Sequence, residues 1–206
     1  MRLAALILSL FAALPASAQS MLPTLFDVTG VAANDRLNVR AMPDASSSIL
    51  SELAPDAKGV EVVAVRSGWG LVNTHERSGW VNMRYLKERA EVWQSGQVPT
   101  TLNCLGTEPF WSLRQVGGNL VYETPEKSRL LQRRAVVDNP SQHSPARSIV
   151  AGDEGGRLTV VLHPAPYPAQ CSDGMSDRAF GLSATLLFEG AGQASRMENG
   201  CCRLTP

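Results

Sequence analysis

Hydrophobic and polar residues alternate over short distances along this chain, a pattern that is typical of β-strands. In the first half, apolar or aromatic positions recur in residues 37–40, in residues 53–65 and around Trp69 and Trp80. Loops that are rich in Asp, Ser, Pro and Gly separate these runs. The spacing predicts a small barrel of short strands over residues 25–89.

The second half carries further runs that predict successive strands, at residues 111–113, 120–122, 147–150, 158–162 and 183–188. Gly117 to Asn119 and Asp153 to Gly156 predict hairpin turns between neighbouring strands. The apolar run from Leu130 to Val137 is interrupted by Gln132, Arg133 and Arg134. Evenly spaced strands predict an antiparallel meander that closes into a barrel or half barrel. The expected fold class is therefore all-β, with a small barrel followed by a second, barrel-like domain.

A boundary between the two halves is expected near residues 88–101, where the strand pattern stops. Residues 90–101 contain Gly96 and Pro99, and their single aromatic residue, Trp93, is expected to anchor the segment. We predict four parts: a signal peptide at residues 1–18, a small barrel at 25–89, a linker at 90–101 and a second β domain at 102–204.

The first residues of the chain have the pattern of a secretory signal. Arg2 precedes an apolar stretch from Leu3 to Leu14, Pro15 ends it, and Ala16-Ser17-Ala18 offers the small-x-small pattern that signal peptidase needs. The stretch has about 12 residues, fewer than the roughly 20 of a membrane-spanning helix, which disfavours an uncleaved anchor. We expect a mature chain that starts at Gln19 and is periplasmic or secreted.

Charge and composition narrow the classes of partner. The 19 basic and 19 acidic residues cancel, and no basic tract is present, so nucleic acid and anionic lipid are poor candidates. No later stretch is long and apolar enough to predict a membrane span. The sequence carries no signal for a cofactor and none for an oligomeric state.

All four cysteines lie in the second half, and an even count in an exported chain indicates disulfides. Cys201 and Cys202 are adjacent, so on a strand their side chains point to opposite faces and reach different partners. Two bridges are expected to tie this pair to Cys104 and Cys171, and spacing alone leaves the connectivity open. The alternatives are metal binding or a redox pair, but the sequence has no C-x-x-C motif and no histidine near these cysteines.

Catalytic signals in the second half are weak. Ser176, in G-M-S-D-R, lacks the second glycine of a nucleophile elbow, and a partner histidine would have to fold back from His143 or His163. Asp173 and Asp177 are too few carboxylates for a calcium site. We therefore expect a turn over residues 173–176, with bonds from side chain to backbone, and we predict no catalytic residue and no metal.

Glu108 is an unusual carboxylate because Pro109, Phe110 and Trp111 follow it directly. Either backbone N–H groups cap it or it pairs with Arg178, and both roles would be structural. A carboxylate in a pocket also suits ligand binding.

Several runs of the first half match one family in order. Residues 37–40 (L-N-V-R), Gly68-Trp69, Gly79-Trp80-Val81 and Tyr85-Leu86 are similar to strands of the bacterial SH3-like domain. The loop at residues 43–48 also matches, but Met42 stands where the family often has a glycine. The resemblance covers most of residues 25–89, and it implies a barrel that binds cell-wall peptides.

A barrel of about 60 residues has a small core, so a few large side chains must fill it. The expected core residues are Val39, Leu50, Val62, Trp80 and Leu86. Glycines before Trp69 and Trp80 are expected to allow tight turns or bulges. Trp69 and Arg40 are explained less easily by packing, and we predict that both contact the ligand, with Trp69 as an aromatic platform.

Three motifs in the second half contain the cysteines: C-L-G-T-E-P-F-W at Cys104, C-S-D-G-M-S-D-R at Cys171 and G-C-C at Gly200. They resemble an uncharacterised family of small exported domains, many of them lipoproteins, from Gram-negative bacteria. The second cysteine, Cys202, departs from the family pattern. The strand pattern is also similar to small barrels of the lysozyme-inhibitor and heat-shock lipoprotein type. No activity follows from this resemblance.

Together these patterns predict an exported, non-catalytic cell-envelope protein that binds peptidoglycan or another peptide through its SH3-like domain. One alternative is a lysozyme-inhibitor-like protein, for which Ser176 with Arg178 is the candidate key loop. Another is a regulator of a cell-wall hydrolase. A hydrolase itself should show a Cys–His or zinc-ligand set in the second half, and the sequence has none.

Overall fold

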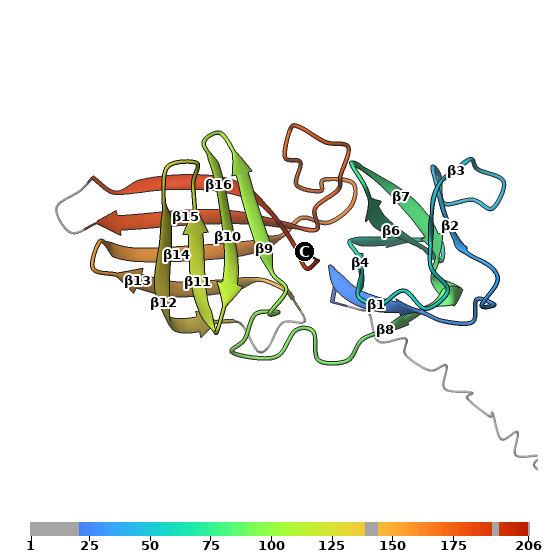
Figure 1. Cartoon of the computed structure of the whole chain (residues 1–206), viewed down its shortest axis with the longest axis horizontal. Coiled ribbons are helices and arrows are strands. Elements are labelled where there is room, and N and C mark those ends of the chain that lie inside the picture. The colour runs from blue at the N-terminus through green and yellow to red at the C-terminus, as the bar shows by residue number, and fades with distance from the viewer. Residues whose placement is uncertain (1–20, 139–143, 191–193, 206) are drawn as a thin grey trace, which may run out of the picture.

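The computed structural model describes residues 21–138, 144–190 and 194–205 of the chain. Its strands fall into two units that stand side by side along the long axis of the molecule (Figure 1). The all-β fold class is confirmed, since the one helical element of the described residues is the short 3₁₀ turn η1, Met83–Tyr85. Within these residues no helix has the length and apolar character needed to cross a bilayer. The expected signal peptide and the expected start at Gln19 lie outside the described residues.

The first unit contains strands β1 to β8 in two sheets. The smaller sheet has the order β4-β1-β8, and the larger has the order β3-β2-β7-β6-β5, with antiparallel neighbours. The strands are β1 Thr24–Val28, β2 Leu37–Arg40, β3 Ile49–Leu53, β4 Val60–Val62, β5 Ala64–Arg66, β6 Trp69–Thr74, β7 Arg77–Asn82 and β8 Leu86–Glu88.

The inner faces of these two sheets pack on each other around apolar side chains. The buried set includes Phe26, Val39, Val62, Val72 and Val81. Such residues alternate with outward-facing ones along each strand, which is why short alternating runs were a useful signal. Of the expected core residues, Val39 and Val62 are fully buried, while Leu50 and Leu86 are half-buried.

The two glycines that precede Trp69 and Trp80 have different roles. Gly68 has a φ of 79° and forms the turn between β5 and β6, as expected. Gly79 lies inside β7, where a Cβ atom would stand 2.6 Å from Val39 Cγ1. Gly79 therefore allows close packing of a strand on the core rather than a turn or a bulge.

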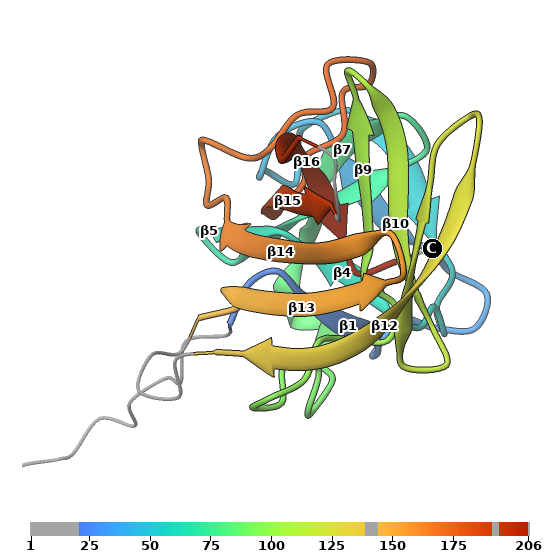
Figure 2. The same cartoon turned by 90° about the vertical axis from the view of Figure 1, so that its left-hand side faces the viewer.

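The second unit is a closed antiparallel barrel with the strand order β10-β11-β12-β13-β14-β15-β16-β9, which confirms the predicted architecture. Figure 2 views the barrel side, with β12, β13 and β14 crossing in front. Residues 117–118 and 154–155 form the tips of the two expected hairpins. The strands are β9 Asn103–Thr107, β10 Phe110–Val116, β11 Asn119–Glu123, β12 Ser128–Val137, β13 Arg147–Asp153, β14 Gly156–Pro164, β15 Leu182–Gly190 and β16 Arg196–Arg203.

Apolar side chains fill the barrel, together with one satisfied polar group. The apolar set includes Trp111, Leu113, Leu131, Ile149, Leu158, Leu162, Leu186 and Phe188. The Tyr122 hydroxyl donates a 2.8 Å hydrogen bond to the buried Glu198 carboxylate. Burial and this carboxylate raise the pKa of Tyr122 to about 12. Arg196 donates to Glu198 at 3.0 Å and so balances its charge.

The segment between β14 and β15, residues 165–181, leaves the barrel and packs against the β6–β7 hairpin of the first unit (Figure 1). We name it the clamp segment. The Asn73 amide donates to the Ala179 carbonyl at 2.8 Å and accepts from the Ala179 N–H at 2.9 Å. Asp177 adds two backbone hydrogen bonds to the hairpin, of 2.8 and 2.9 Å. These bonds join the clamp segment to the β6–β7 hairpin and so link the two units.

Trp80 is only 6% exposed, but it fills the contact between the units rather than the core of the first unit. Its ring meets that of Tyr167, in the clamp segment, edge-on at 5.7 Å between centroids, and Ala179 packs in the same cluster. The prediction that Trp80 fills the small barrel is therefore wrong. Alternation along β7 turns Val81 inward and leaves Trp80 on the outer face.

A second contact forms where β1 and β4 face the barrel. Leu25 and Glu61 are cross-strand partners, so their side chains share one face of the sheet. Leu25 joins the hydrophobic core of the barrel. Glu61 is 5% exposed, and its Oε1 accepts a 3.0 Å hydrogen bond from the backbone N–H of Leu204. The described C-terminal residues thus lie between the two units (Figure 1).

Residues 90–101 cross from the first unit to the barrel without forming a strand. The Trp93 ring N–H donates to the Pro23 carbonyl at 2.7 Å, and the Arg147 guanidinium lies 5.3 Å from the centre of that ring. Arg147 also donates to the Gln97 carbonyl at 3.2 Å. The connection is therefore held against both units.

Candidate functional site

Arg40, Trp69 and Trp80 stand on the outer face of the larger sheet. Arg40 of β2 lies opposite Trp80 of β7, and Trp69 of β6 lies opposite Asn82. The clamp segment covers this face at Trp80. The end with Arg40 and Trp69 remains open as a groove of about 550 Å³, which we name the Trp69 groove.

The lining of the Trp69 groove is aromatic and mainly basic. Its aromatic residues are Trp69 and Tyr85, and its charged residues are Asp35, Arg36, Arg40 and Arg84. Three guanidinium groups against one carboxylate make the local potential positive. The two residues that the sequence singled out are thus brought together, and their contact with a ligand stays a prediction.

Arg40 also holds one wall of the groove in place. Its Nη1 donates a 2.6 Å hydrogen bond to the carbonyl of Ser47, across the loop that joins β2 and β3. Within that loop, the Ser46 N–H donates to Asp44 at 2.7 Å, and this bond lowers the pKa of Asp44. Met42 is 59% exposed, and its backbone N–H donates to the Ser47 hydroxyl at 3.0 Å. Arg40 is therefore in part a positioning residue.

Arg84 and Arg36 are the more available cations. The Arg84 guanidinium lies 4.9 Å from the centre of the Tyr85 ring, and its backbone N–H donates to Asn82, which caps η1. Among the residues that the structure describes, neither Arg36 nor Arg84 forms an ion pair. Their charges are therefore available to an anionic ligand.

The four cysteines form two disulfides, Cys104–Cys202 and Cys171–Cys201, and none of the described cysteines is free. Cys202 joins the barrel core, and the neighbouring Cys201 reaches the clamp segment, as adjacent residues on a strand must. The structure thereby gives the connectivity that spacing left open. Two disulfides are compatible with an oxidising compartment.

The described residues contain no group of three or more side chains that could hold a metal ion.

The expected turn at Asp173 is present. Its Oδ1 accepts hydrogen bonds from the N–H groups of Met175, at 3.0 Å, and Ser176, at 2.9 Å. Burial raises the pKa of Asp173, but these bonds oppose burial, and the net pKa lies below its ordinary value. The Ser176 hydroxyl also donates to Asp173, at 2.9 Å, and so is engaged in the turn. His143, a conceivable partner of Ser176, lies outside the described residues.

Neither of the two structural roles considered for Glu108, capping by backbone N–H groups and pairing with Arg178, is found among the described residues. Arg178 donates to the His75 carbonyl and pairs with Glu76 at 2.9 Å, so it fastens the clamp segment to the first unit. Glu108 stands exposed at the tip of the β9–β10 hairpin. It makes no hydrogen bond or ion pair with any residue in the described ranges.

The chain was compared with protein-family models, curated proteins and solved structures, and none of them matched. Functional inference therefore depends on the geometry and chemistry of the sites.

Proposed function

We propose that this is an exported, non-catalytic cell-envelope protein that binds a peptide of peptidoglycan in the Trp69 groove. The observation that carries the proposal is the meeting of Arg40 and Trp69 in one open groove with a surplus of arginine. The resemblance of residues 25–89 to bacterial SH3-like domains supports the same ligand class.

The chemistry of the groove suits a short peptide with free carboxylates, and the stem peptides of peptidoglycan have that character. Guanidinium groups such as those of Arg36 and Arg84 bind carboxylates through charge-assisted, often bidentate, hydrogen bonds. The rings of Trp69 and Tyr85 supply flat apolar area for aliphatic side chains. Charge and shape therefore favour the same ligand.

The alternative, a lysozyme-inhibitor-like protein or a hydrolase regulator, has less support. Its candidate key residues, Ser176 and Arg178, are both engaged in bonds within the protein. The open groove of the first unit has no such internal occupant among the described residues.

Co-sedimentation of the mature chain with purified, insoluble peptidoglycan tests the proposal. Trp69→Ala should weaken binding about fivefold or more, because truncating a central aromatic anchor of an interface costs over about 1 kcal/mol. Trp69 is half-buried at the first position of β6, so thermal unfolding should show that the variant still folds. Phe110→Ala is the matched control, since it removes an exposed aromatic of the other unit.

Two results would contradict the proposal. One is unchanged binding by a folded Trp69→Ala protein. The other is an equal loss in Phe110→Ala. A soluble stem peptide with amidated carboxylates should bind more weakly than the free acid, because the arginines then lose their charge-assisted partners.

A further inference from the structure

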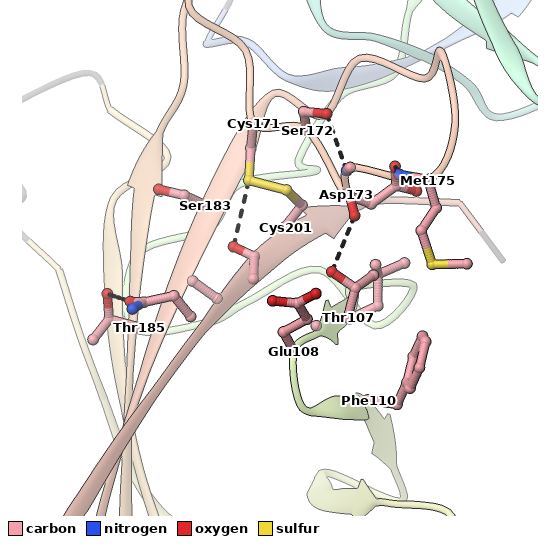
Figure 3. A pocket seen from close by; sticks show the side chains of 16 residues that line it. Thr107, Glu108, Phe110, Cys171, Ser172, Asp173, Met175, Ser183, Thr185 and Cys201 are labelled. Carbon is pink, nitrogen blue, oxygen red and sulfur yellow. Dashed lines mark hydrogen bonds between the residues drawn. A yellow bond between two sulfur atoms is a disulfide. The ribbon is translucent and has the colours of Figure 1, made fainter.

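Two sequence motifs that the proposed function does not use meet on the barrel surface. The tip of the β9–β10 hairpin carries Glu108 and Phe110, and the clamp segment carries Asp173 and Met175 (Figure 3). The Thr107 hydroxyl joins the two by donating to the Asp173 carbonyl at 3.0 Å, across 66 positions of sequence. Distant segments thus become the facing walls of one hollow.

That hollow is a groove of about 790 Å³ over the outer face of β15 and β16 (Figure 3). Its lining includes the polar side chains of Ser183, Thr185 and Asn199, and the Thr185 hydroxyl donates to Asn199 at 3.1 Å. A second hollow of about 490 Å³ extends over β9 and β10 and shares Phe110 and Met175 with the first. We name the two hollows together the motif groove.

Every charged residue that lines the motif groove is acidic. Glu108 and Asp173 line the first hollow, and Glu76, Glu123 and Asp173 line the second. Asp173 accepts hydrogen bonds within the turn at residues 173–176. Glu76 and Glu123 form ion pairs with arginines. Glu108 is the carboxylate that stays exposed without a partner among the described residues. The groove therefore offers a negative lining and one available anion.

Large apolar side chains flank this anion. Phe110 is 56% exposed and Met175 is 70% exposed, although both belong to well-anchored segments. Exposed apolar groups beside a hollow are typical of a binding surface, and the thioether of Met175 adapts to varied partners. The Cys171–Cys201 disulfide fixes the clamp wall to β16, so the groove is largely pre-formed.

We propose that the motif groove binds an extended, cationic peptide segment of a partner protein. A lysine or arginine side chain of that segment lies against Glu108, and an adjacent apolar side chain lies between Phe110 and Met175. The Thr185–Asn199 hydrogen bond leaves the Asn199 amide N–H groups and the lone pairs of the Thr185 oxygen available to the peptide backbone. Charge complementarity selects this occupant, since an acidic lining attracts a cation and repels the carboxylate-rich ligand proposed for the Trp69 groove.

Fluorescence anisotropy of the mature chain with a labelled, amidated pentapeptide, Ala-Lys-Phe-Lys-Ala, tests this site. We expect saturable binding that weakens as salt is added, because salt screens exposed charges. Glu108→Gln should weaken binding about fivefold, the upper range for an exposed ion pair. Phe110→Ala should weaken it about tenfold, as expected for an aromatic anchor.

Glu154→Gln is the matched control, because Glu154 is an exposed carboxylate in the β13–β14 turn, outside the lining of the groove. It should bind like the wild type. Equal binding of the glutamate peptide Ala-Glu-Phe-Glu-Ala would overturn the proposal, as would no saturable binding of the lysine peptide at millimolar concentration. Insensitivity to both Glu108→Gln and Phe110→Ala would also overturn it. Peptidoglycan co-sedimentation tests the Trp69 groove separately, so either proposal can be refuted without refuting the other.

Discussion

Glu61 makes pH a direct probe of the contact between the two units. Glu61 is 5% exposed, and the polar and charged groups that act on its carboxyl group are the Leu204 N–H and the Arg203 side chain. Burial has the largest effect and raises the pKa of Glu61 from 4.5 to about 7, although Leu204 and Arg203 oppose it. Between these two values the folded protein holds a proton at Glu61 that the unfolded chain has released.

An extra proton in the folded state means that the free energy of unfolding falls as pH rises through this window. The stabilising effect of the protonated carboxyl is fully present below pH 4.5 and is lost as pH passes about 7. At about 1.4 kcal/mol for each pH unit, the distance between the two pKa values corresponds to about 3–4 kcal/mol. That amount is a large fraction of the stability of an ordinary domain.

Urea unfolding at a series of pH values from about 4 to about 8 measures this effect, because the range covers both pKa values. Glu61→Gln keeps an oxygen for the Leu204 N–H but cannot ionise, so it should lack the fall and exceed the wild type in stability above neutral pH. Glu52→Gln, at an exposed position of β3, should keep the fall seen in the wild type. Identical pH profiles for the wild type and Glu61→Gln would refute the argument, because groups elsewhere titrate alike in both proteins.

Two further predictions concern the clamp segment and its disulfide. Trp80→Ala should lower the free energy of unfolding by about 3–5 kcal/mol and speed proteolysis within residues 165–181, since the side chain fills the contact with Tyr167. An unchanged melting temperature and cleavage rate would contradict that role. Replacing both Cys171 and Cys201 by alanine should cost about 2–4 kcal/mol in urea unfolding. Thiol titration of the denatured, unreduced wild type should find no free thiol, and two or more would contradict the pairing.

Local patterns were sufficient to predict most of the barrel. The β10–β11 hairpin follows from Gly117 and Gly118, which both adopt positive φ between two alternating runs. Strand β12 left no such signal, because Leu131 is its one buried residue and the other positions are partly or fully exposed. A strand in a barrel wall that buries so little has no period of two to detect.

The errors concentrate where the two units meet. Alternation shows that Trp80 and Glu61 point away from the core of the first unit, but it does not show what covers them. Their burial depends on the clamp segment and on the chain end at Leu204, which are more than 80 residues away in sequence. The motifs at Cys104 and Cys171 lie side by side in the structure, and the sequence held one indirect signal of this, the adjacent cysteines. A bridge from Cys201 to Cys171 must bring the motif at Cys171 to β16.

The clamp segment is fastened at both sides, by Asn73 and Glu76 to the first unit and by the Cys171–Cys201 bond to the barrel. The Trp69 groove and the motif groove are therefore not joined by a flexible tether. With a flexible tether, the length of the linker sets the effective concentration for a second binding event. Here the fixed separation and orientation of the two grooves set the effective concentration. Under the two binding proposals, two ligands therefore gain avidity only when the distance between them matches the distance between the grooves. The molecule would then select a pair of ligands by the distance between them, in addition to linking them.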